Sequence, residues 1–144
     1  MTGRFISFEG IDGAGKSTQI AAISKWFRNR GDDVLLTREP GGTPLAEELR
    51  AMVLNRPMDP LTGLLLIFAG RRAHLQTCIL PALAAGKTVL CDRFTDSSFA
   101  YQGGGRGLPL AGREPLDEWL QEGTEPELTF CLDLSPTIAA DLRA

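Results

Sequence analysis

The chain has 144 residues, a formal net charge of −3 and 43% hydrophobic residues. This length suits one domain with a substantial core, and the slight acidic excess argues against a broad surface for nucleic acid or membranes. The most apolar stretch, residues 61–70, is too short to span a bilayer. The 3 cysteines lie far apart in apolar surroundings, which favours buried thiols in a reducing compartment. We therefore expect a cytoplasmic protein without a signal peptide.

A glycine-rich stretch after the first predicted strand organises the rest of the chain. Residues 4–9 have the pattern of a strand and residues 16–30 that of an amphipathic helix, with G-x-x-x-x-G-K-S between them. Glycines let backbone amides approach phosphate oxygens, and the helix N-terminus adds a positive dipole. Lys16 would meet the outer phosphates, and Ser17 would give a hydroxyl oxygen to Mg²⁺. The predicted nucleotide-binding residues are Gly10, Ile11, Asp12, Gly13, Ala14, Gly15, Lys16, Ser17 and Thr18.

A charged turn follows the second predicted strand. Residues 34–37 form a short apolar run typical of a buried parallel strand, and Arg38, Glu39 and Pro40 come next. Open α/β sheets bind their ligands at the carboxyl ends of such strands. Arg38 and Glu39 could be a solvated ion pair beside the turn. Alternatively, Arg38 binds a phosphate through its planar fork while Glu39 positions Mg²⁺ or its waters.

A helix is expected directly after this turn. Thr43 is predicted to be its N-cap, with a proline at the first helical position. Leu45, Leu49 and Met52 recur at helical spacing and would form its apolar stripe. Arg50 lies beside that stripe and could be either a surface charge or a second phosphate contact.

A second helix, predicted over residues 61–80, carries an arginine on its apolar face. Phe68 and Arg72 are four residues apart and therefore share one side of the helix. A ring and a guanidinium so placed could stack on a nucleobase and bond its edge, although spacing alone favours core packing for Phe68. The only histidine, His74, is interpreted as a surface or helix-end residue.

The third predicted strand, residues 88–91, ends in Asp92 and Arg93. A carboxylate in this position behind a phosphate loop reaches the Mg²⁺ shell, and Arg93 would face the same cleft. The segment that follows, residues 94–107, is either a mobile surface loop or a loop that reads the edge of a base. Its candidate contacts are Ser98, Tyr101 and Gln102.

These patterns predict an α/β fold of the P-loop NTPase type, a three-layer α/β/α arrangement with a mostly parallel sheet. Basic side chains from the phosphate loop and from two other segments would meet at one edge of that sheet. This is more positive charge than one triphosphate needs, and a second phosphorylated ligand would account for it. An acceptor phosphate requires no separate protein nucleophile. We therefore predict a small-molecule kinase that acts on a nucleoside monophosphate.

The chain also resembles a known family. The stretches FEGIDGAGKST and TREPGGT, the sequence Asp92-Arg93-Phe94 and the segment AYQGGGRG stand in the order found in bacterial thymidylate kinases. Those enzymes convert dTMP and ATP to dTDP and ADP, so the resemblance implies dTTP biosynthesis, with ATP as co-substrate and Mg²⁺ as cofactor. By position, it implies metal contacts from Ser17, Glu39 and Asp92. The implied catalytic residues are Asp12, Lys16, Arg38, Glu39 and Arg93.

The resemblance also implies how dTMP would be bound. Arg38, Arg50 and Arg93 would hold its phosphate, Phe68 would stack on thymine, and Arg72 would bond the edge of the base. Asp12 would approach the sugar 3′-hydroxyl or the cluster of phosphates and metal. The remaining members of the implied dTMP pocket are Glu39, Pro40, Ser98, Tyr101 and Gln102.

One departure from the family concerns its catalytic arginine. Some members carry that arginine in the phosphate loop, where this chain has Ile11, Asp12, Gly13 and Ala14; others carry it in a lid after the fourth strand. We expect residues 1–144 to form a single P-loop kinase domain that lacks its lid and C-terminal portion. A homodimer is expected by resemblance. The alternatives are another P-loop nucleotide or nucleoside kinase, and a nucleotide-dependent regulatory switch.

Overall fold

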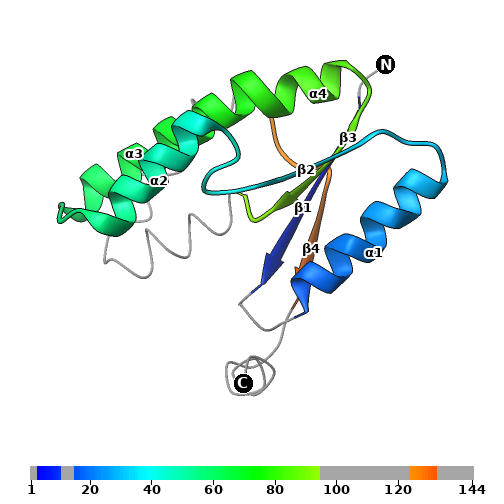
Figure 1. The fold of residues 1–144 in the computed structure, drawn as a ribbon, viewed down its shortest axis with the longest axis horizontal. Helices are drawn as coiled ribbons and strands as arrows, with labels where there is room; N and C mark the ends of the chain where they lie inside the picture. Colours follow the sequence, from blue (N-terminus) through cyan, green and yellow to red (C-terminus); the bar gives the residue numbers. More distant parts are fainter. Residues whose placement is uncertain (1–2, 11–14, 95–123, 133–144) are drawn as a thin grey trace. The chain divides into compact units, whose positions relative to one another are not determined.

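The computed structural model describes residues 3–10, 15–94 and 124–132 of the chain (Figure 1). The chain forms two compact units, each of which is built from segments that are separated in the sequence. The first unit comprises Met1–Thr37, Ala82–Arg93 and Pro126–Ala144, and the second comprises Arg38–Pro81 and Phe94–Glu125.

The first unit contains a parallel sheet, which confirms the predicted α/β class. The strand order is β2-β3-β1-β4, and β1 pairs in parallel with both β3 and β4. In this register Phe8 lies opposite Asp92 on one side and Phe130 on the other, so the carboxyl ends of these strands lie at one edge. The elements are β1 (Arg4–Gly10), α1 (Lys16–Asn29), β2 (Val34–Arg38), β3 (Thr88–Asp92) and β4 (Leu128–Leu132).

The core of the first unit lies between the sheet and α1. Ile6, Phe8 and Leu90 from the strands are buried with Phe27 from the helix. The ring of Phe8 also stacks on that of Phe130, with centroids 5.3 Å apart. The predicted apolar face of α1 is therefore confirmed.

The second strand differs from its prediction. Residues 34–36 were expected to be buried on both sides, but in the described sheet β2 is an edge strand and Leu36 is 47% exposed. An edge strand has a neighbour on one side only, and hydrophobicity alone does not reveal that position.

The second unit is built around two helices that pack against each other. They are α2 (Pro44–Asn55) and α3 (Pro60–His74), and α3 continues through a π-helical turn, η1 (Leu75–Ile79), into α4 (Leu80–Ala84). A side chain at Gly70 would lie only 3.4 Å from Ala46, so these two small residues permit a close approach of α2 and α3. Within the described ranges no helix is long and apolar enough to cross a membrane.

The predicted apolar stripe of α2 holds in part, because Leu49 and Met52 are partly buried but Leu45 is not. Leu45 is 53% exposed, whereas Ala46 and Val53 are buried. Apolar residues are so frequent along this helix that its sequence does not fix the buried face. The packing partner α3 determines which face of α2 is buried, because it accommodates the small side chain of Ala46.

The predicted N-cap at Thr43 is confirmed, and Asp59 caps α3 with a bond of the same kind. The Thr43 hydroxyl oxygen accepts from the backbone N–H of Ala46 at 3.1 Å, and Asp59 accepts from that of Thr62 at 3.1 Å. Hydrogen bonds from the side chain and then the backbone of Thr62 lower the pKa of the Asp59 carboxyl. Both caps satisfy amide groups that a helix leaves without partners in its first turn.

Replacing Thr43 by alanine tests the cap of α2. Thr43→Ala removes the acceptor for the Ala46 amide and should lower the free energy of unfolding by about 1 kcal/mol. Thr43→Ser keeps the hydroxyl and is the matched control, measured by the same chemical denaturation. Equal stability of the alanine and serine variants would show that this cap contributes nothing.

Candidate functional site

The phosphate loop has the predicted strand–loop–helix setting. Strand β1 ends at Gly10, and α1 begins at Lys16. Gly15 stands between loop and helix with φ 83°, a left-handed conformation that glycine adopts without steric cost. Four predicted loop residues, Ile11, Asp12, Gly13 and Ala14, lie outside the described residues.

Lys16 and Asp92 form the charged centre of this part of the site. The Lys16 side chain is 8% exposed, and its Nζ lies 2.7 Å from Asp92 Oδ1. Asp92 is the last residue of β3, the strand next to β1, which explains how two residues far apart in sequence meet. The cation predicted to bind phosphate is thus held beside the carboxylate predicted to approach Mg²⁺.

The donors present here are chemically suited to Mg²⁺. The side chain of Ser17 is exposed in the first turn of α1, and Asp92 supplies a partly exposed carboxylate. Mg²⁺ prefers oxygen ligands and commonly takes only one or two carboxylates together with substrate phosphates. No group of three His, Cys, Asp or Glu residues within the described ranges could hold a metal without such help.

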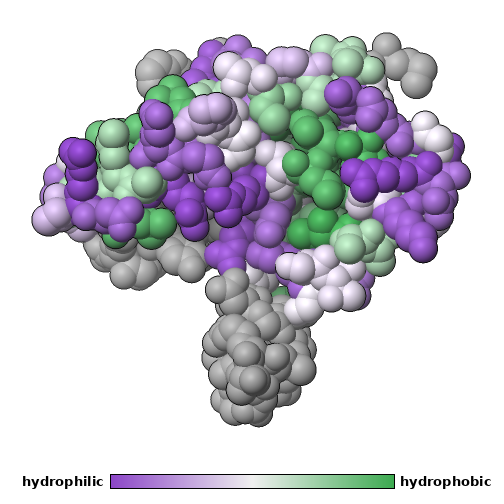
Figure 2. Space-filling view, viewed as in Figure 1, coloured by the Kyte–Doolittle hydropathy of each residue, from purple (hydrophilic) through white to green (hydrophobic). Residues whose placement is uncertain are grey.

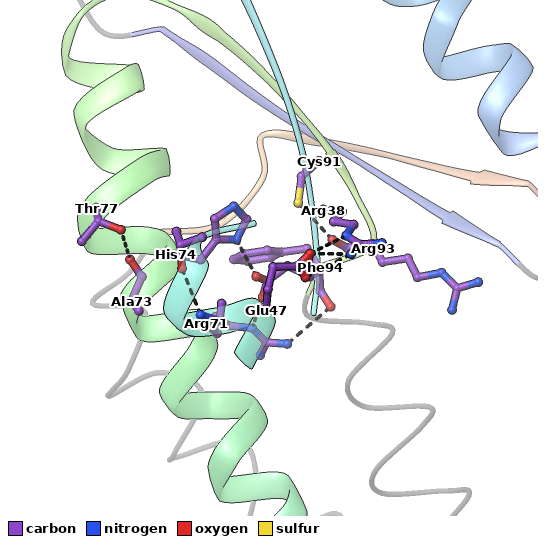
Figure 3. Close-up of polar contacts among 12 residues, drawn as sticks. Arg38, Glu47, Arg71, Ala73, His74, Thr77, Cys91, Arg93 and Phe94 are labelled. Carbon is purple, nitrogen blue, oxygen red and sulfur yellow. Dashed lines mark hydrogen bonds and ion pairs between the residues drawn. The ribbon is translucent and has the colours of Figure 1, made fainter. Parts of the chain in front are cut away.

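Arg93 has an unusual backbone immediately after this centre. Its φ is 70°, a left-handed value that non-glycine residues rarely adopt. Its amide donates to the Phe8 carbonyl at 2.8 Å, and the Cys91 thiol donates to the Arg93 carbonyl at 3.0 Å (Figure 3). These bonds fix the turn in which the predicted phosphate-binding side chain begins. Backbone strain of this kind often accompanies functional sites.

Arg38, the first residue of the second unit, pairs with Glu47 rather than with its neighbour Glu39. Its Nη2 donates to Glu47 Oε2 at 3.0 Å and also to Oε1, and its Nε donates to Oε1 at 3.2 Å (Figure 3). The Arg38 side chain remains 52% exposed. The guanidinium is therefore oriented by a carboxylate and still accessible to a solute anion.

Glu39 lies in a different environment, because its carboxylate is buried. Its Oε1 accepts from Arg71 Nε at 2.9 Å, and its Oε2 lies 2.5 Å from His74 Nδ1. The residue is 4% exposed, while Arg71 and His74 are 1% and 0% exposed. The solvated-pair interpretation of Arg38 with Glu39 is therefore wrong. The proposed contact of Glu39 with Mg²⁺ remains a prediction.

The sequence interpretation missed both partners of Glu39. His74 is predicted at the surface but is fully buried. Arg71 is also buried, although the sequence pattern singled out its neighbour Arg72 instead. A signal was available, since Arg71 and His74 are three residues apart and continue the apolar face of α3 that includes Leu64. Polar residues on a buried helix face usually have bonded partners, so the pattern pointed to a carboxylate elsewhere.

The predicted base-binding residues differ in exposure. Phe68 is buried, with the Arg71 guanidinium carbon 5.3 Å from its ring centroid, as the core-packing alternative requires. Arg72 and Arg50 are partly exposed, as is Pro40. Whether they contact dTMP stays a prediction. Ser98, Tyr101 and Gln102 lie outside the described residues.

Gly42 offers a test of the packing around His74. A Cβ at Gly42 would come within 2.6 Å of His74 Cδ2, whereas one at Gly31 would meet no atom within 4 Å. The two glycines have nearly equal φ, 93° and 91°. Gly31→Ala should therefore cost about 1 kcal/mol from the backbone alone, and Gly42→Ala about 1 kcal/mol more from overlap with the ring. Equal losses in thermal unfolding would contradict the described position of His74.

Comparison with known proteins agrees with the resemblance found in the sequence. A family model described as thymidylate kinase matches residues 8–142. The chain is 53% identical to the thymidylate kinase of Paraburkholderia xenovorans (strain LB400), with 99% of this chain and 71% of that protein covered. It is 58% identical to the thymidylate kinase of Albidiferax ferrireducens (strain ATCC BAA-621 / DSM 15236 / T118), covering 99% and 70%.

A solved structure provides independent support. The crystal structure of thymidylate kinase from Ehrlichia chaffeensis matches with a TM-score of 0.84 and 37% sequence identity, covering 99% of this chain and 78% of that one. Because the family model, the sequence relatives and this fold agree, the chain belongs to the thymidylate kinase family.

Proposed function

We propose that this protein transfers a phosphoryl group from ATP to dTMP, with Mg²⁺ as cofactor. The observation that carries the proposal is the contact between Lys16 and Asp92 at the start of a helix that follows a phosphate loop. Family membership identifies the acceptor as dTMP and the products as dTDP and ADP.

On the ATP side, the chain supplies charge and oriented donors. Lys16 would leave Asp92 in part to meet the outer phosphates, while the first turn of α1 directs unpaired amides toward them. Ser17 and Asp92 would hold Mg²⁺, which neutralises charge on the phosphates when bound. These residues position and stabilise the phosphates, and no protein side chain has to form a covalent bond.

On the acceptor side, arginines would hold the dTMP phosphate. Arg38 and Arg93, with Arg50 as a further contact, have the planar fork that suits a phosphate. Because Arg38 is already oriented by the Glu47 carboxylate, an acceptor phosphate would meet a guanidinium that is partly preorganised. The acceptor oxygen belongs to dTMP itself, which explains why the proposal needs no serine or cysteine nucleophile.

The base and sugar would be recognised by residues from two segments. Phe68 would stack on thymine after a local adjustment, and Arg72 would donate to the edge of the ring. Asp12 is proposed near the sugar or the phosphate–metal cluster. The remaining contacts proposed by resemblance are Pro40, Ser98, Tyr101 and Gln102.

We also propose that the protein is a cytoplasmic homodimer. Large apolar side chains are exposed on α2 and α3, and Figure 2 shows hydrophobic areas among polar ones over these helices. Such side chains commonly mark contact surfaces between subunits. The exposed leucines are Leu45 and Leu54 on α2, and Leu61 and Leu65 on α3.

The activity is tested by ADP formation on the full-length protein with ATP, Mg²⁺ and single nucleoside monophosphates. ADP should form only with an acceptor, most efficiently with dTMP, and chelation of Mg²⁺ should stop the reaction. Lys16→Met should lower kcat by about 10²-fold or more, because the moving phosphate loses a cation. Lys25→Met, an exposed lysine of the same helix, is the matched control and should leave the rate unchanged.

Two outcomes would favour the alternatives. ADP release that ignores every monophosphate would indicate a nucleotide-dependent switch. A preference for another nucleotide or nucleoside would indicate a different P-loop kinase.

The dimer is tested by placing a charge on the surface of α2. Leu54→Glu should shift the full-length protein from dimer to monomer in sedimentation velocity, because a carboxylate would be buried at the interface. Lys25→Glu on α1 introduces the same side chain elsewhere and should leave the dimer intact. A wild-type monomer, or a variant that still dimerises, would exclude this surface as the interface.

A further inference from the structure

We propose that Glu39, Arg71 and His74 form a buried anchor that positions the phosphate-binding Arg38 and thereby sets affinity for the phosphate of dTMP. The inference depends on the proposed binding of dTMP. Arg71 and His74 need not touch the substrate, since they are 1% and 0% exposed. They are positioning residues, and they act through Arg38.

The first step of the argument is the sequence neighbourhood of Glu39. Arg38 precedes it directly and is 52% exposed, whereas Glu39 is buried. Arg38 is the last residue of β2, and the chain bends at Glu39 immediately after it. Fixing the Glu39 carboxylate in the interior therefore turns the Arg38 side chain outward, where Glu47 completes its orientation.

The second step is the place of Arg71. Its guanidinium carbon lies 5.3 Å from the ring centroids of both Phe68 and Phe94, and its Nη2 donates to the Phe94 carbonyl at 3.5 Å. Since Arg71 also bonds Glu39, one side chain on α3 contacts both the residue after Arg38 and Phe94, and Figure 3 shows Arg71 beside Phe94. A movement of Arg71 would thus displace Glu39 and, with it, the segment that carries Arg38.

The third step is the place of His74 at the end of α3. Its Nδ1 faces Glu39, and its other edge is packed so closely on Gly42 that a Cβ would not fit there. The imidazole therefore fixes both the beginning and the end of the turn 39–42. The helix widens into the π-helical turn Leu75–Ile79 immediately after His74, and such turns frequently occur at functional sites.

The cluster also has a charge requirement. A buried carboxylate is tolerated only when it is paired and hydrogen-bonded, and removal of one partner leaves a charge that is poorly compensated. Loss of the His74 donor should therefore displace Glu39, and with it Arg38, without altering Lys16 or the start of α1.

The experiment compares binding of dTMP with binding of thymidine, which lacks the phosphate, by calorimetry on the full-length protein. The variants are His74→Leu, which removes the donor, and His74→Asn, whose amide nitrogen can replace Nδ1. His74→Leu should weaken dTMP binding roughly 10- to 100-fold and leave thymidine binding and the KM for ATP unchanged. His74→Asn should restore most of the dTMP affinity.

Three results would overturn the inference. They are equal losses for dTMP and thymidine, no loss for either, and a parallel loss of ATP affinity, each of which indicates a structural role alone. If His74→Leu does not fold, Arg71→Lys gives the same comparison, because it keeps the charge and loses the fork that reaches both Glu39 and Phe94. A wild-type protein that binds neither dTMP nor thymidine would instead contradict the proposed function.

Discussion

Burial of the Glu39 carboxylate imposes a requirement that the surrounding residues must satisfy together. Each of its oxygens faces one basic side chain, Arg71 or His74, and water has almost no access. An ionised carboxylate in such a place is stable only with good geometry on both sides. Three features are therefore linked: the turn that follows β2, the face that α3 turns toward Glu39, and the glycine at position 42. A change in any of them would disturb the pairing of the Glu39 charge.

A second constraint acts in the parallel sheet of the first unit. Because β1 and β3 are neighbours in register, the residue that ends β3 comes close to the first residue of α1. The contact between Lys16 and Asp92 follows from this topology and not from their separation in sequence. The two compact units thus hold different parts of the proposed chemistry. The first contains the phosphate loop with Asp92, and the second contains Arg38 and Arg72.

Features with a local cause could be predicted from the sequence. The helix start after Gly15, the capping hydroxyl of Thr43 and the buried strand before Asp92 each depend on a few adjacent residues, and the structure confirms all three. The exposure of Leu45 could not be predicted in the same way, and the burial of His74 follows from the sequence only through its place on the apolar face of α3. Both depend on which face of the helix packs against an element far away in sequence. In a helix rich in apolar residues, the sequence is compatible with burial of more than one face.

The cluster around Glu39 also shows why a buried ion network is weak evidence for stability. Replacing such a network with apolar side chains of similar volume is often neutral or stabilising, because the cost of removing the charges from water disappears. Stability alone therefore does not explain a carboxylate at position 39. An apolar residue there could fill the same space but could not connect Arg71 and His74 through directional bonds. The exposed neighbour Arg38 needs a defined orientation, since a phosphate is recognised by a guanidinium held in one orientation. The buried charge is thus better explained by the geometry it imposes on the binding loop than by the energy it adds to the fold.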